Sequence, residues 1–83
     1  MADMGRVAKQ APVTAELAMT RVIDELRLER GRTQAQLAAG AGISQPLVSR
    51  ILSGERSATL TELLGLCRAV GVELSELARR AGA

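Results

Sequence analysis

The chain is 83 residues long, which is enough for one small domain with a single core. It contains no Phe, Trp or Tyr, so this core must be built from Leu, Val, Ile, Ala and Met. The net charge of +2 is too small to indicate a nucleic-acid partner by itself, so evidence for such a partner must come from where the charges lie in the chain.

Several classes of protein are disfavoured by what the sequence lacks. It has no histidine, no paired cysteines and no glycine-rich phosphate loop, so an enzyme is the least favoured class. We expect neither a metal ion nor a cofactor. The single cysteine, Cys67, lies on an apolar helix face and is expected to pack in the core. No apolar run could span a bilayer and no secretion signal is evident, so we expect a cytoplasmic protein.

The first twelve residues show no sustained hydrophobic period and end in Pro12. We therefore expect residues 1–12 to form a flexible N-terminal tail and residues 13–83 to form the folded domain. Arg6 and Lys9 allow two interpretations of the tail. It is either a basic arm that touches DNA phosphates or the minor groove, or a disordered terminus without a function.

A helix is predicted from about Thr14 to Arg30. Leu17, Ile23 and Leu26 fall at a spacing that places them on one face of such a helix. Gly31 follows this segment directly and can end the helix, because glycine tolerates the left-handed conformation in which many helices end.

Two short helices joined by a tight turn are predicted within residues 33–54. Thr33 can cap the first helix, and Gln36 can complete a capping box with it. Gly42 suits the reversal that follows, and Ser44 can cap the second helix. Gly40, inside the first helix, costs about 1 kcal/mol relative to alanine, and the sequence offers no reason for it.

The second of these helices has an inner and an outer face. Val48 and Ile51 are three residues apart and are expected to point into the core. The outer face carries polar side chains with no evident role in the core: Gln45, Ser49, Arg50 and Ser53. A helix that enters the major groove presents such side chains to the bases, where Gln can pair with adenine and Arg with guanine.

Two further helices are predicted toward the C-terminus. Thr59 and Glu62 form a second capping box, followed by a helix that ends at about Val70. Its apolar residues fall at helical spacing: Leu60, Leu63, Leu64, Cys67 and Val70. A short helix from about Glu73 to Arg80 completes the chain. Four helices in a row end at a glycine, so we predict an all-α bundle of about five helices.

Residues 33–54 resemble the helix-turn-helix of the phage Cro/C1 repressor family, also called the Xre-like family. In that pattern a Gln opens the first helix, a small residue follows the first core leucine, a Gly occupies the turn, and two aliphatic residues hold the recognition helix. The matching residues are Gln34, Ala38, Gly42, Val48 and Ile51. The likeness extends over about residues 20–80. It implies a lambda-repressor-like domain that binds double-stranded DNA in a sequence-specific manner.

The resemblance assigns base reading to the start of the recognition helix: Gln45, Pro46, Ser49 and Arg50, with Ser44 between base and phosphate. Pro46 also has a purely structural explanation, because proline suits the first turn of a helix. The exposed N–H groups that open the first helix favour a phosphate, and the loop after the second can reach another. The candidate phosphate-binding residues are Arg32, Thr33, Gln34, Ser53, Arg56, Ser57 and Thr59. For Arg32 and Arg56 the alternative is an ordinary solvated surface charge.

The sequence departs from the family at one ion pair. Many members pair an Arg of the first helix with a Glu near the end of the recognition helix. Arg27 matches the former, but Leu52 occupies the position of the latter. We therefore expect Arg27 to find Glu55 or the last carbonyls of the recognition helix, or to turn outward.

Family members commonly dimerise through the region that matches the last two helices. We expect a homodimer with an interface at Leu66, Leu74, Leu77 and Ala81, unless these residues simply close the monomer core. Its recognition helices, about 34 Å apart, would bind a palindrome with half-sites one turn apart. The leading hypothesis is a transcription regulator of the controller-protein or phage and plasmid repressor type. The alternative is a DNA-binding antitoxin or interaction module whose main partner is another protein chain.

Overall fold

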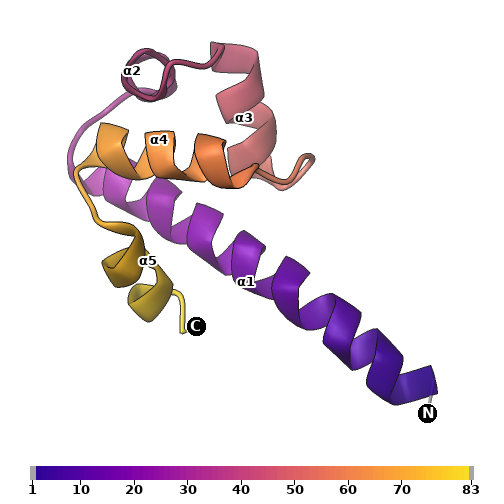
Figure 1. The fold of residues 1–83 in the computed structure, drawn as a ribbon. Coiled ribbons are helices and arrows are strands. Elements are labelled where there is room, and N and C mark those ends of the chain that lie inside the picture. Colours follow the sequence, from indigo (N-terminus) through magenta and orange to yellow (C-terminus); the bar gives the residue numbers. More distant parts are fainter. Residues whose placement is uncertain (1, 83) are drawn as a thin grey trace.

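In a computed structural model of the chain, the backbone is described for residues 2–82 and the side chains for residues 15–82. The helices are α1 (Ala2–Glu29), α2 (Gln34–Ala41), α3 (Gln45–Ser53), α4 (Leu60–Val70) and α5 (Leu74–Arg80). Residues 2–82 contain no strand, so the predicted all-α bundle is confirmed (Figure 1). Within this part of the chain, no helix combines the length and apolar character needed to cross a membrane.

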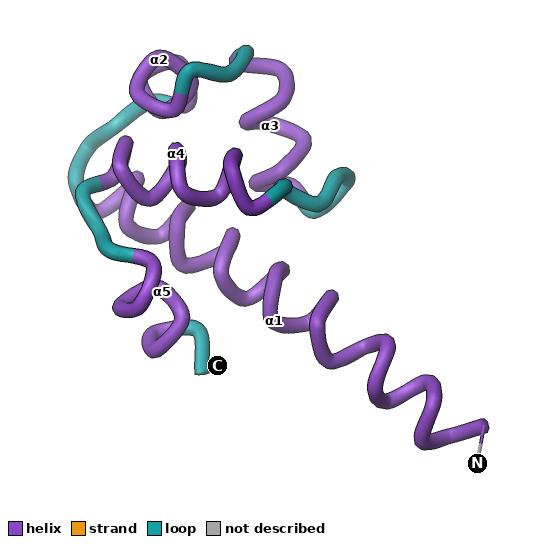
Figure 2. The backbone as a smooth tube through the Cα atoms, in the orientation of Figure 1, coloured by secondary structure: helices purple, strands orange, loops and turns teal. Residues whose placement is uncertain are grey.

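Helix α1 begins much earlier than expected. It starts at Ala2 rather than near Thr14, so most of the segment expected to be a flexible tail continues the helix. Figure 2 shows the N-terminal half of α1 extending away from the other helices, which gather around its C-terminal half. Proline is disfavoured inside helices, and this is why the expected boundary fell after Pro12. The division of the chain into a tail of residues 1–12 and a domain of residues 13–83 stays a prediction.

The core lies where the five helices meet. Every helix contributes at least one large side chain that is almost completely buried: Ile23, Leu26, Leu37, Val48, Ile51, Leu66, Val70 and Leu77. Cys67 is buried among them, as expected, and its burial raises the pKa of the thiol. Apart from Cys67, the fully buried hydrophobic residues of the core are all aliphatic, because the chain supplies no aromatic side chain.

The apolar stripes of the sequence are wider than the faces that the fold buries. Leu60 and Leu64 belong to the apolar stripe of α4 that the helical spacing predicts, but they are 64% and 41% exposed. Successive helical residues are about 100° apart, so residues four apart share a side, and this pair lies on the part of the α4 surface that the bundle leaves exposed. Leu17 of α1 is also exposed rather than buried.

Both predicted capping boxes are present. The Thr33 hydroxyl accepts the Gln36 backbone N–H at 3.0 Å, and the Thr33 N–H donates to Gln36 Oε1 at 2.8 Å. Thr59 and Glu62 form the same pair of bonds at the start of α4. Helix α2 ends at Gly42, whose φ of 72° is the left-handed conformation that favours glycine. The bounds of α2 and α4 are thus set by local residues.

Helices α2 and α4 approach each other through small residues, and theirs is the most extensive contact between two helices. A Cβ atom at Gly40 would lie 2.9 Å from the Cβ of Ala69. A Cβ atom at Gly65 would lie 2.9 Å from the carbonyl oxygen of Ala41. Both distances are shorter than real Cβ contacts, so a larger residue at either position would push the helices apart. Close packing is therefore the reason for Gly40 that the sequence did not offer.

Arg27 finds a partner other than those expected. Its Nε donates to Asp24 Oδ1 at 2.9 Å, and its Nη1 donates to the backbone carbonyl of Arg32 at 3.0 Å. The expected partners, Glu55 and the last carbonyls of the recognition helix, are therefore wrong. Since Leu52 offers no charge, Arg27 instead braces the connection between α1 and α2.

Two more arginines connect this segment to the end of α4. The guanidinium of Arg32 donates to the carbonyl of Ala69, and that of Arg30 donates to the carbonyls of Val70 and Gly71. Carbonyls in the last turn of a helix have no partner within the helix. The two side chains therefore cap α4 and fix the place where α2 begins.

Replacing Gly40 with alanine tests the contact between α2 and α4. We expect Gly40→Ala to lower the free energy of unfolding by about 1–3 kcal/mol, although alanine is the better helix former. The double variant Gly40→Ala/Ala69→Gly relieves the closest clash, so it should lose less stability than the two single changes added together. Denaturant unfolding measures both effects. A stabilised Gly40→Ala variant would contradict the close contact.

Replacing Arg32 with alanine tests the cap on α4. The change leaves the Ala69 carbonyl without its side-chain donor, and we expect a loss of about 1 kcal/mol in the free energy of unfolding. The control is Arg79→Ala, which removes the same charge from a side chain that is 78% exposed and pairs only within α5. Unfolding midpoints in denaturant compare the two variants, and equal losses would argue against the cap.

Candidate nucleic-acid interface

Helices α2 and α3 form the helix-turn-helix. Their connection, residues 42–44, begins at Gly42 and ends at Ser44, whose hydroxyl accepts the Leu47 backbone N–H at 3.3 Å and so caps α3. Val48 and Ile51 are buried and anchor α3 to the bundle. Because these two residues face inward, the opposite side of α3 is turned toward solvent.

The predicted base-reading residues come together on that exposed side. All of them are exposed in the structure: Ser44, Gln45, Pro46, Ser49 and Arg50. Residues three and four apart lie next to each other on a helix, so they form one continuous surface at the start and middle of α3. Among the described residues, the side chains of Gln45, Ser49 and Arg50 have no hydrogen-bond or ion-pair partner. They are therefore available to an external ligand.

The N-terminus of α2 offers backbone donors. Two of its first N–H groups are satisfied, since Gln36 donates to the Thr33 hydroxyl and Leu37 donates to the Thr33 carbonyl. Helix geometry gives the N–H groups of Gln34 and Ala35 no acceptor within the helix. Together with the positive end of the helix dipole, they form a place suited to an anion.

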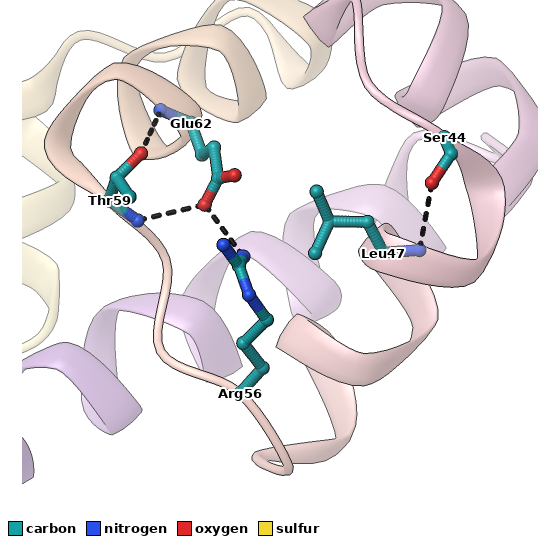
Figure 3. A network of polar contacts seen from close by, with 5 residues as sticks. All are labelled: Ser44, Leu47, Arg56, Thr59 and Glu62. Carbon is teal, nitrogen blue, oxygen red and sulfur yellow. Dashed lines mark hydrogen bonds and ion pairs between the residues drawn. The ribbon is translucent and has the colours of Figure 1, made fainter.

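The loop between α3 and α4 holds the second group of candidate phosphate-binding residues. Arg56 is held by an ion pair, with its Nη1 2.8 Å from Glu62 Oε1 (Figure 3). The hydrogen bond from Arg56, together with that from the Thr59 backbone, lowers the pKa of the Glu62 carboxyl. The carboxylate is therefore charged at neutral pH. Ser57 is exposed between these residues.

The structure gives several candidate phosphate-binding residues other contacts. The Arg32 guanidinium donates to the Ala69 carbonyl, and the hydroxyls of Thr33 and Thr59 cap helices. The Ser53 hydroxyl lies within hydrogen-bond distance of two alternative acceptors, the Arg50 carbonyl and the Glu55 carboxylate. These side chains are placed by the protein itself. All four residues are nevertheless exposed, and in the sequence they lie on either side of the outer face of α3.

Two of the four residues expected at a dimer interface are unsuited to it. Leu66 and Leu77 are 0% exposed, because they fill the space between α1, α4 and α5 in the monomer core. Leu74 and Ala81 are half-buried and remain candidates. Sequence reasoning missed a more exposed apolar surface, which consists of Leu60 and Leu64 (the α4 leucine pair). Their spacing of four residues was visible, but it did not reveal which side of α4 the bundle covers.

A groove of about 300 Å³ lies between α1 and α5, away from the helix-turn-helix. It is lined by Val22, Glu25, Leu26, Glu29 and Arg80. The described residues contain no cluster of His, Cys, Asp or Glu that could hold a metal ion. The charged residues of this groove are two glutamates and one arginine, and its apolar residues are Val22 and Leu26.

A comparison with protein families matches the helix-turn-helix family over residues 23–77, about two thirds of the chain. The matched span begins at Ile23 in α1 and ends at Leu77 in α5, so it includes α2, α3 and the helices that hold them. Searches among curated proteins and among solved structures found no significant match. With its buried anchors beneath α3 and its exposed polar face, the chain belongs to the Cro/C1-type helix-turn-helix family of DNA-binding proteins.

Proposed function

We propose that this protein is a sequence-specific transcription regulator that places α3 in the major groove of double-stranded DNA. The observation that carries the proposal is the outer face of α3. There Gln45, Ser49 and Arg50 are exposed and have no partner among the described residues, while Val48 and Ile51 anchor the helix. The protein acts in the cytoplasm by occupying its site, as small controller proteins and phage or plasmid repressors do.

Base recognition follows from the side chains on this face. Gln45 opens α3 and can pair with adenine through two hydrogen bonds, whereas Arg50 can pair with guanine in the same way. Ser44 and Ser49 add hydroxyl groups that accept or donate a hydrogen bond. Pro46 offers only its ring, which suits contact with a thymine methyl group.

Phosphate contacts on both sides of the groove would fix this orientation. On one side, the N–H groups of Gln34 and Ala35 face a phosphate beside Thr33. Arg32 has five N–H donors and donates through Nη1 to the Ala69 carbonyl, so other N–H groups remain for DNA. On the other side, the loop after α3 contributes Ser53, Ser57 and Thr59, and it contributes Arg56 once this side chain is released from Glu62.

A dimer explains how such a small domain would gain specificity. One copy of α3 contacts few base pairs, and two copies related by a two-fold axis would contact a palindrome with half-sites one helical turn apart. We assign the interface to the α4 leucine pair, together with Leu74 of α5 and Ala81, which follows that helix. Burial of these apolar side chains would also stabilise a core that lacks aromatic residues.

A second candidate function is that of a DNA-binding antitoxin or interaction module with a different protein chain as its main partner. The observation in its favour is the N-terminal half of α1, which extends away from the bundle (Figure 2). A helix gains most of its stability from packing against something else. Co-purification of a second chain that protects residues 2–14 from proteolysis would favour this function.

Selection of bound duplexes from a random pool tests the main proposal. We expect enrichment of an inverted repeat. The mass of the protein–DNA complex should show that two copies of the chain bind each duplex. The selection is repeated at two salt concentrations, because attraction to phosphates alone weakens steeply with salt and enriches no sequence. Binding without enrichment would contradict sequence-specific recognition.

Replacing Arg50 tests base reading on the enriched duplex. We expect Arg50→Ala to weaken binding by about 1–3 kcal/mol and to relax the preference at one base position. Arg79→Ala is the matched control, because it removes the same charge from α5, far from α3 (Figure 1). Titrations with single-base variants of the duplex measure the preference. An equal loss on every duplex would make Arg50 a phosphate contact instead.

Replacing the α4 leucine pair tests the proposed interface. Both side chains are exposed, so Leu60→Ser/Leu64→Ser should leave the monomer folded while converting the dimer to a monomer. Leu28→Ser is the control, since Leu28 is 63% exposed but lies on α1. Sedimentation gives the mass, and circular dichroism checks the fold. An unchanged dimer mass would exclude these two leucines from the interface.

A further inference from the structure

The ion pair between Arg56 and Glu62 lies inside the surface that the proposed function assigns to DNA. Arg56 extends from the loop between α3 and α4, and its side chain reaches toward the first turn of α4 (Figure 3). Its Nη1 is 2.8 Å from Glu62 Oε1. The Arg56 side chain is 41% exposed and that of Glu62 only 15%, so the arginine is the accessible member of the pair.

Glu62 is held in place independently of Arg56. Its Oε1 accepts the Thr59 backbone N–H at 2.9 Å, and its own N–H donates to the Thr59 hydroxyl at 3.1 Å. The carboxylate also lies in the first turn of α4, where the helix dipole favours a negative charge. These contacts fix the carboxylate, so the guanidinium is the member of the pair that can change partner.

We propose that Glu62 is a positioning residue that lowers the affinity for DNA by competing with a phosphate for the guanidinium of Arg56. This inference rests on the DNA binding proposed above. A carboxylate and a phosphate are alternative acceptors for the same N–H groups of arginine. While Glu62 holds Arg56, the guanidinium is not free to make the phosphate contact.

The competition has a consequence for the salt dependence of binding. Each phosphate neutralised by a free cation releases counterions and adds about 0.9 to the slope of log K against log salt. An arginine that keeps its internal carboxylate partner does not add this contribution. The wild-type slope should therefore lack the contribution of Arg56, and removal of the Glu62 charge should restore it.

Glu62→Gln separates the charge from the capping role. Glutamine is also a capping-box residue, so its Oε1 can still accept the Thr59 N–H and α4 keeps its cap. The matched control is Glu76→Gln, which changes the net charge equally. Glu76 pairs with Arg80 at 2.8 Å on α5, so its replacement releases an arginine away from α3.

The test measures affinities of the full chain for the selected operator duplex and for a duplex of unrelated sequence, at several salt concentrations. We expect Glu62→Gln to bind both duplexes about two- to fivefold more tightly, as an exposed ion pair of this kind allows. The slope should become steeper by about 0.9. Glu76→Gln should change both the affinity and the salt slope by less than Glu62→Gln does.

A double variant identifies Arg56 as the residue through which Glu62 acts. We expect Arg56→Ala to cost little affinity in the wild type and to cancel the whole gain in the Glu62→Gln background. The inference is overturned by unchanged or weaker binding of Glu62→Gln, by an equal gain in Glu76→Gln, or by a gain that survives Arg56→Ala. If the wild type binds neither duplex, the proposed function itself fails. Unfolding midpoints confirm that each variant is folded.

Discussion

The close contact of α2 with α4 is the constraint on which the rest of the structure depends. A core without aromatic side chains can be filled only if the helices approach closely, and Gly40 and Gly65 allow this by presenting no Cβ atom. The contact fixes α2, and the short turn after α2 then fixes α3. The direction in which α3 points is therefore decided at a contact between two helices that carries none of the predicted base-reading residues.

The arginines of this chain divide between structural and surface roles, which a net charge of +2 conceals. Arg27, Arg30 and Arg32 donate to backbone carbonyls around the start of α2 and the end of α4. Arg56 is neutralised by a carboxylate, whereas the Arg50 side chain has no ion-pair partner among the described residues. Charge counting alone therefore overstates how much positive charge faces a ligand at the helix-turn-helix.

Sequence reasoning succeeded where the decisive contacts are local. The capping boxes at Thr33 and Thr59 involve residues three apart, and the inward position of Val48 follows from helical spacing. It failed where the answer depends on packing between distant segments. Spacing could not reveal that Leu66 is buried while Leu60 is exposed, because that depends on which side of α4 meets the bundle.

The buried thiol of Cys67 is a natural probe for the opening of α4. The thiolate is the reactive form of cysteine, and burial raises the pKa of this thiol and keeps reagents out. A disulfide reagent can therefore react only when α4 separates from its neighbours. The reaction rate therefore measures how often α4 opens at the position of Cys67, in the part of the bundle that holds α2 and α3 in place.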